Sequence, residues 1–298
     1  MKLESLLVKA AKLGSTIVAV ASAEDEEVID AISEAIRHNV ADFLLFGKKE
    51  EIEELLIANG IGINKVKIIQ ARTKEQAAEL AVRAVRQNEA SVLMKGNLPT
   101  ATLLKVVLNK EFGLRTDRVL SHVAIFEIPG FFKFVIVTDA AMNLEPDLQQ
   151  KQQIVVNAVG IAKAIGIENP NVAALAAVEV VNPSMQATID AASLTLMNKR
   201  GQIKNCHIDG PLALDNAISL DAASRKGIKS DVAGKADILL VPTIEVGNVL
   251  YKSLIYFANA KVGAVIAGAK APIVLTSRSD SSESKLYSLA LAICSSEK

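Results

Sequence analysis

The chain has 298 residues, of which 50% are apolar, so it can bury a large core as one α/β domain or as two lobes. Its 33 Lys and Arg residues balance 33 Asp and Glu residues, which argues against a nucleic-acid or anionic-membrane partner, because such binding needs an excess of cations. Two cysteines, Cys206 and Cys294, are too few for a disulfide scaffold and favour a reducing compartment.

The N-terminal segment predicts an amphipathic helix. Leu3, Leu6, Leu7 and Ala10 recur at helical spacing, and charged residues interrupt the apolar stretch, which is unlike a signal peptide. No apolar run approaches the roughly 18–20 residues that a membrane span requires. We therefore expect a soluble cytoplasmic protein.

Apolar strand-like runs alternate with helical patterns over the first hundred residues. The runs are 15–21, 41–47, 65–70 and 91–96, and each is followed by a segment with helical spacing. Nearly continuous apolar strands separated by helices predict an α/β fold with a mostly parallel sheet covered by helices on both faces.

The pattern changes after Asn109. Two aromatic and β-branched runs on either side of Pro129-Gly130 predict a β-hairpin. The last segment again has an apolar strand-like run followed by a helical pattern, as in the first hundred residues. We therefore expect a discontinuous first domain, 1–116 plus 265–298, and a second α/β domain, 117–264.

The segment 271–294 is the most informative candidate site. A buried strand ends at Ser277-Arg278, and Asp280 with Glu283 has the spacing of a capping box at a helix start. Free backbone N–H groups at a helix N-terminus attract anions, and an Arg side chain can grip phosphate with two parallel hydrogen bonds. The alternative is an ordinary helix cap beside a solvated Arg278.

Two other turns after strands carry polar groups. Lys95, Asn97 and Thr100 follow the strand 91–96 and can direct donors at a ligand, although an ordinary βα turn explains them equally well. The pair Gly247-Asn248 sits near a helix start, where glycine permits close backbone approach and Asn offers a donor and an acceptor. The alternative for Gly247 is tight packing of the helix on the sheet.

Signals for metals and nucleotides are weak. The three histidines, at positions 38, 122 and 207, make no ligand pattern, so no metal site is predicted. Residues 263–270 are a near miss to a phosphate loop, because the Lys comes one residue late and no Ser or Thr follows it.

Four blocks together resemble the phosphate acetyl/butyryltransferase family. They are SVLMKGNLPTATLLKVVLN, DGPLALDNAIS, SDVAGKADILLVPTIEVGNVLYKSL and TSRSDSSESK. They occur in the order that the family has, over nearly the whole chain. The first hundred residues look more like those of butyryltransferases.

This resemblance implies a two-lobed, three-layer αβα fold like that of isocitrate and isopropylmalate dehydrogenases, with the active site in the cleft between the lobes. It implies homodimers or larger assemblies. It also implies the reaction acyl-CoA + phosphate ⇌ acyl phosphate + CoA, by direct transfer in a ternary complex, with coenzyme A as a substrate and with no cofactor or metal.

The resemblance also implies roles for single residues. Ser277 and Arg278 match the Ser-Arg pair that steadies the developing oxyanion and holds phosphate. Lys105 falls where acetyltransferases carry an arginine, so that position keeps only a cation. The acidic residue of acetyltransferases falls at Ser284, which leaves Asp280 and Glu283 as alternative bases.

Three alternatives to a phosphate butyryltransferase stay open. An acetyl preference is possible within the same chemistry, because the pocket volume sets it. A metal-dependent hydroxyacid dehydrogenase would share the expected fold, but it needs clustered aspartates and a nucleotide site. A non-catalytic CoA- or phosphate-binding protein would bind the same ligands without turnover.

Overall fold

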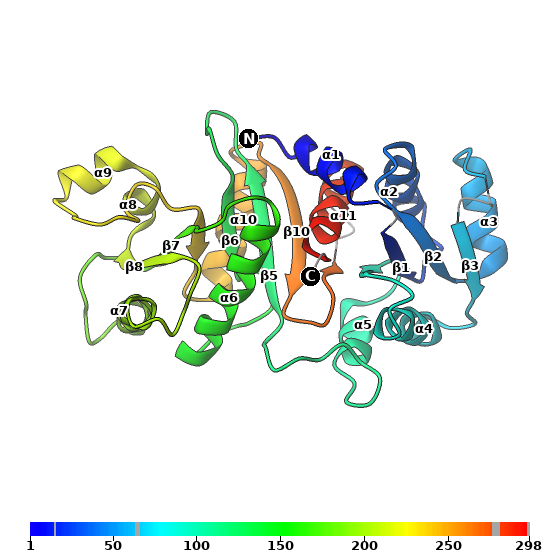
Figure 1. Cartoon of the computed structure of the whole chain (residues 1–298), viewed down its shortest axis with the longest axis horizontal. Coiled ribbons are helices and arrows are strands. Elements are labelled where there is room, and N and C mark those ends of the chain that lie inside the picture. The colour runs from blue at the N-terminus through cyan, green and yellow to red at the C-terminus, as the bar shows by residue number, and fades with distance from the viewer. Residues whose placement is uncertain (15, 63–65, 276–280, 297–298) are drawn as a thin grey trace. The chain divides into compact units, whose positions relative to one another are not determined.

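A computed structural model describes residues 1–14, 16–62, 66–275 and 281–296 of the chain (Figure 1). The chain forms two compact units. The N-terminal unit comprises Lys2–Arg118 and Val262–Lys298, and the central unit comprises Val119–Lys261 together with Met1. Among the described residues, no helix has both the length and the apolar character that a membrane span needs.

The N-terminal unit is built on a mostly parallel sheet. Its strands are β1 (Ile17–Ala21), β2 (Asp42–Gly47), β3 (Val66–Gln70), β4 (Val92–Lys95), β10 (Lys261–Ala267) and β11 (Ile273–Val274). Their order is β3-β2-β1-β4-β11-β10. All neighbours pair in parallel except β10, which runs antiparallel to β11. The strands predicted within the first hundred residues are thereby confirmed.

Helices cover both faces of this sheet. They are α1 (Glu4–Lys12), α2 (Glu26–Arg37), α3 (Lys49–Ala58), α4 (Lys74–Arg86), α5 (Thr100–Val107) and α11 (Ser282–Ser296). In Figure 1, α2 and α4 lie on opposite sides of β1 and β2. This follows from right-handed crossovers, because α2 leads the chain outward from β1 to β2 and α4 leads it back to β4.

Local sequence explains where these helices begin. The side chain of Asp25 accepts the backbone N–H of Val28 at the start of α2, and Thr73 does the same for Gln76 at the start of α4. The predicted apolar stripe of α1 is buried, and α1 packs against α11, which also packs against α2. Helix α11 is buried from Lys285 to Cys294.

The central unit holds a second set of strands. They are β5 (Ser121–Glu127), β6 (Val135–Thr138), β7 (Asn171–Leu175), β8 (His207–Leu212) and β9 (Ile238–Leu240), in the order β5-β6-β9-β7-β8. Strands β5 and β6 form the antiparallel hairpin predicted around Pro129-Gly130, and Gly130 has φ of 85°. The other neighbours are parallel. The predicted mixed α/β class with mostly parallel strands is confirmed.

The helices of the central unit are α6 (Leu148–Ala164), α7 (Gln186–Lys199), α8 (Leu214–Ile218), α9 (Leu220–Arg225) and α10 (Ile244–Tyr256). Helix α6 begins at Leu148, because Asp147 and Gln150 form a capping box there. Strand β7 ends at Leu175. Glu179 lies in the loop beyond β7, where its carboxylate is engaged by Asn216 and Lys226.

Candidate functional site

The candidate anion site between β11 and α11 falls largely on residues 276–280. Ser277, Arg278 and Asp280 therefore lie outside the described residues, and their roles stay predictions. The described flanks are the end of β11 at Val274 and the start of α11 at Ser282. Both belong to the N-terminal unit.

The first turn of α11 is tied to the first turn of α2. The ammonium group of Lys285, whose side chain is 3% exposed, donates to Oε2 of Glu27. This hydrogen bond and the charge of Lys285 lower the pKa of Glu27. The helix that follows the Ser277-Arg278 segment thus has its start fixed against a second helix N-terminus.

Glu283, one of the two candidate bases, lies in the exposed first turn of α11. Its Oε1 accepts a hydrogen bond of 3.0 Å from the hydroxyl of Tyr287, one turn further along the helix. Ser284 falls where acetyltransferases carry an acidic residue. Its backbone N–H donates a hydrogen bond of 3.2 Å to the hydroxyl of Ser281. A role of Glu283 as base stays a prediction.

Lys95 ends β4, and Asn97 lies in the turn that follows. The ammonium of Lys95 donates to the carbonyl oxygens of Gly96, at 3.0 Å, and Leu98, at 3.4 Å. The amide of Asn97 donates to the carbonyl oxygen of Glu24, at 3.2 Å, and its Oδ1 accepts from Lys74 at 3.3 Å. The side chain of Asn97 thus links the turn after β4 to the turn after β1.

Backbone groups bring these two turns together as well. The backbone N–H of Gly96 donates to the carbonyl oxygen of Ala21 at 2.8 Å. The backbone N–H of Asn97 donates to the carbonyl oxygen of Ser22 at 2.6 Å. A Cβ on Gly96 would overlap the carbonyl oxygen of Ser22 and lie 2.7 Å from that of Ala21. Only glycine fits this close approach.

The two turns lie at a topological switch point. Strands β1 and β4 are parallel neighbours, and the chain leaves β1 toward β2 but returns on the other side to β4. In open α/β sheets, ligands bind outside the carboxyl ends of strands at such a reversal of strand order. Sequence reasoning found the β4 half, Lys95 and Asn97, and missed the β1 half, Ser22 and Glu24. A Ser and a Glu before a helix cap carry no distinguishing signal in sequence.

The remaining candidates of this unit lie on α5. Thr100 opens the helix and Lys105 is in its last turn, and both side chains are exposed. Neither side chain takes part in the hydrogen bonds given above between the turn after β1 and the turn after β4. Their substrate contacts stay predictions.

Gly247 and Asn248 lie in the first part of α10, in the central unit. A Cβ on Gly247 would lie 2.7 Å from the carbonyl oxygen of Asp139 and 2.8 Å from Cα of Ala140. The glycine thus permits tight packing of α10 on the turn after β6, which is the alternative that the sequence left open. Asn248 is exposed beside it.

Asp139 organises that turn. It is 2% exposed, and its Oδ1 accepts the backbone N–H groups of His122, Ala141 and Met142. Its Oδ2 accepts the backbone N–H of Asn143 at 3.2 Å and the Asn143 side-chain amide at 2.6 Å. Sequence reasoning missed this role of Asp139.

Comparisons with known proteins decide the family. Residues 75–293 match the family model described as phosphate acetyl/butaryl transferase. The chain belongs to this family.

Two full-length relatives of the phosphate acetyl/butaryl transferase family differ in name. A probable phosphate butyryltransferase of Bacillus subtilis (strain 168) is 59% identical over 298 residues, which cover 100% of this chain and 99% of the relative. A phosphate acetyltransferase of Thermotoga maritima is 46% identical, covering 98% of this chain and 99% of the relative. The resemblance seen in the sequence blocks is confirmed.

Solved structures agree with this family membership. A branched-chain phosphotransacylase from Enterococcus faecalis V583 has a TM-score of 0.84 and 37% identity, covering 94% of this chain and 99% of that one. A 4-hydroxythreonine-4-phosphate dehydrogenase from Klebsiella pneumoniae has a TM-score of 0.59 at 11% identity, and the match covers 95% of this chain and 100% of that one. The second likeness concerns the fold alone and agrees with the expected dehydrogenase-like fold.

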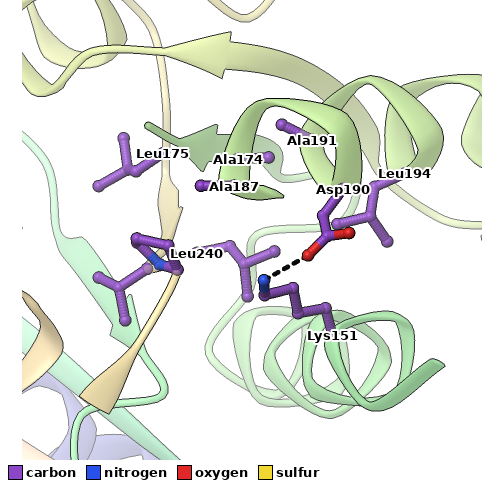
Figure 2. A pocket seen from close by; sticks show the side chains of 10 residues that line it. Lys151, Ala174, Leu175, Ala187, Asp190, Ala191, Leu194 and Leu240 are labelled. Atoms are coloured by element: carbon purple, nitrogen blue, oxygen red, sulfur yellow. Dashed lines mark hydrogen bonds and ion pairs between the residues drawn. The ribbon is translucent and has the colours of Figure 1, made fainter. Parts of the chain in front are cut away.

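One pocket of this transferase-family chain lies in the central unit and is too small for its expected substrates. Figure 2 shows the side chains of Lys151 and Asp190 pointing toward each other beside this pocket. Nζ of Lys151 lies 2.6 Å from Oδ2 of Asp190. The pocket has a volume of about 10 Å³, which is room for about one water molecule. Its walls are mostly apolar and include Ala174, Leu175 and Leu194.

Two further observations concern the Cys206 thiol and the possible metal-ligating side chains. Burial raises the pKa of the Cys206 thiol to about 11, which keeps it protonated near neutral pH. Across residues 1–14, 16–62, 66–275 and 281–296, no group of three or more His, Cys, Asp or Glu side chains is arranged to hold a metal ion.

Proposed function

We propose that the chain catalyses acyl-CoA + phosphate ⇌ acyl phosphate + CoA, with butyryl or a related short or branched acyl group. The observation that carries this proposal is the 59% identity, over the full length, to a relative named for phosphate butyryl transfer. The E. faecalis structure, titled a branched-chain phosphotransacylase, supports the same acyl range.

An acetyl preference is the second candidate. The T. maritima relative named phosphate acetyltransferase favours it, at 46% identity over nearly the full chain. One methylene group in a hydrophobic pocket changes discrimination by only about 1–3 kcal/mol. A few pocket side chains are therefore enough to separate the two activities.

The transfer proceeds directly between the two bound substrates. A phosphate oxygen attacks the thioester carbonyl carbon, the C–S bond breaks, and the CoA thiolate leaves and takes up a proton. Orienting two bound reactants supplies up to about 7–11 kcal/mol. No cofactor takes part, and coenzyme A is a substrate.

Two side chains carry the proposed electrostatic work. Arg278 holds phosphate with its planar guanidinium group, and Ser277 donates to the oxygen on which charge develops. A donor aimed at such an oxyanion contributes about 3–4 kcal/mol. The ion pair of Lys285 with Glu27 supports this assignment, because it fixes the start of the helix that follows both residues.

A homo-oligomer, a dimer or larger, is part of the proposal. Exposed apolar side chains lie along α10 and just beyond it, at Val246, Val249, Tyr256 and Phe257, with exposures from 43% to 86%. Apolar side chains of this size favour burial against another surface. Size-exclusion chromatography with light scattering tests the assembly, and a monomer at micromolar concentration would contradict it.

Residence in the cytoplasm is also proposed. Cys206 and Cys294 are buried and are not joined in a disulfide, which suits a reducing compartment. The balanced charge suits small-molecule substrates rather than nucleic acid or a membrane surface. Fractionation of the native host, with the activity followed in each fraction, tests this placement.

A thiol-release assay tests the reaction itself. The purified protein is mixed with phosphate and, in separate reactions, acetyl-, propionyl-, butyryl- or isobutyryl-CoA. We expect phosphate-dependent release of CoA that is fastest with a four-carbon acyl group. Release fastest with acetyl-CoA would establish the second candidate. CoA binding without any release would reject catalysis and leave a binding protein.

A further inference from the structure

Glu24, in the turn after β1, has one carboxylate oxygen with no hydrogen-bond donor among the described residues. Its Oε1 accepts the hydroxyl of Ser22 at 2.8 Å. Its Oε2 is buried and accepts no hydrogen bond from any of the described residues. A buried carboxylate oxygen without a donor is unfavourable, and such an atom in a native structure calls for an explanation.

The surroundings hold Glu24 firmly in this position. Its carbonyl oxygen accepts the Asn97 amide, and the N–H of the preceding residue, Ala23, donates to Phe46 of β2 at 3.0 Å. A Cβ on Gly47, the last residue of β2, would overlap Oε2 and lie 3.0 Å from Cδ of Glu24. The carboxylate therefore occupies space that only a glycine at position 47 leaves open.

Two other carboxylates that follow the carboxyl ends of strands are engaged. Asp139 accepts five hydrogen bonds, and Glu179 accepts from Lys226 and Asn216. Glu24 differs, because one of its oxygens is set in place without a donor. This arrangement suits a group that receives its donor from a ligand.

We propose that Oε2 of Glu24 accepts a hydrogen bond from the pantetheine arm of CoA. This assignment rests on the proposed transacylase function. Phosphate and the phosphorylated end of CoA repel a carboxylate, and a short acyl chain has no donor. The pantetheine arm is uncharged and carries amide N–H groups and a hydroxyl, which are the donors that a carboxylate oxygen lacks here.

Substitutions at two positions test the assignment by different routes. Glu24→Ala removes the acceptor, and Gly47→Ala displaces it without altering its chemistry. A hydrogen bond to a charged group changes affinity by about tenfold or more. We expect either variant to raise the KM for butyryl-CoA about tenfold, with kcat and the KM for phosphate within about twofold of wild type. Glu24→Gln keeps an acceptor oxygen and gives a smaller rise.

Inhibition by CoA fragments locates the contact. In Glu24→Ala the inhibition constant of pantetheine rises, and that of adenosine 3′,5′-bisphosphate does not change. Glu26→Gln, an exposed carboxylate in the first turn of α2, is the matched control and behaves as wild type. Circular dichroism melts establish that each variant is folded.

Three results would overturn the assignment. The first is an unchanged KM for butyryl-CoA in folded Glu24→Ala. The second is a loss of kcat alone in Glu24→Gln with a shifted pH profile, which would make Glu24 a base. The third is weakened inhibition by the bisphosphate instead of pantetheine. If the wild type shows no phosphate-dependent release, calorimetric titration of CoA into wild type and Glu24→Ala still tests the contact.

Discussion

Lys285 of α11 and Glu27 of α2 form an ion pair between positions 258 residues apart in the sequence. The lysine is buried and the glutamate is more than half exposed, at 3% and 56% of their side-chain surface. A buried ammonium group without a partner is costly. The pair therefore fixes the first turn of α11 beside the candidate phosphate-binding segment.

Glu27→Gln should lower the melting temperature and reduce activity, because it leaves Lys285 buried without a countercharge. The pKa of Glu27 is lowered from its ordinary value of 4.5 by this pair, so the stabilisation is present above that value and is lost as pH falls through the lowered pKa. Thermal melts from pH 7 to pH 3 should show the wild type and the variant converging at the acid end. A constant difference over that range would contradict this account.

Gly96→Ala should destabilise the chain by about 3 kcal/mol, because the new methyl group meets backbone rather than a movable side chain. Gly160→Ala is the matched control, since a Cβ on Gly160 meets nothing within 4 Å and the residue lies inside α6. That change should stabilise by about 0.5–1 kcal/mol. Denaturant unfolding of both variants measures the contrast, and equal stabilities would refute the close approach.

Removal of one partner of the Lys151–Asp190 pair should cost about 3–5 kcal/mol, because the other charge stays buried. Among the described residues, Lys151→Met leaves the side-chain amide of Gln186, at 2.8 Å, as the donor to the Asp190 carboxylate. The double variant Lys151→Met/Asp190→Leu should lose less stability than the sum of the single variants. Chemical denaturation of the four proteins gives the coupling, and strict additivity would argue against it.

Cys206 should react slowly with thiol reagents in the folded protein. Its pKa of about 11 leaves the thiolate roughly two- to three-hundredfold scarcer than in an ordinary thiol of pKa about 8.5. In a Cys294→Ala background, colour development with a disulfide reagent at pH 8 should be slow until guanidinium unfolds the chain. Rapid reaction of the native protein would show that the thiol is accessible and ionised.

Arg278→Lys should lower kcat/KM for phosphate by at least about tenfold, because lysine keeps the charge but loses the two parallel donors. Arg225→Lys, an exposed position on α9, is the control and should leave the kinetics unchanged. Steady-state rates at varied phosphate measure both. Near-normal turnover of Arg278→Lys would remove this residue from the phosphate site.

The strands were predictable because each is an apolar run bounded by turn residues, as in 41–47 and 91–96. The β5–β6 hairpin followed from Pro129-Gly130 in the same local way. The link from Asn97 to Glu24 spans 73 residues, and no local pattern reports such a pairing. The anchoring of a turn by Asp139 was likewise hidden, because its five hydrogen bonds, from four residues, form only once the turn is folded.

The packing of α11 on α1 and α2 has a consequence for biosynthesis. A ribosome makes α1 and β4 early, but their partners α11 and β11 come only after the entire central unit has been translated. At about 5–20 residues per second, the nascent N-terminal unit keeps an uncovered sheet edge and an apolar helix face for several seconds or longer. Chaperone capture during translation should therefore concentrate on the first hundred residues.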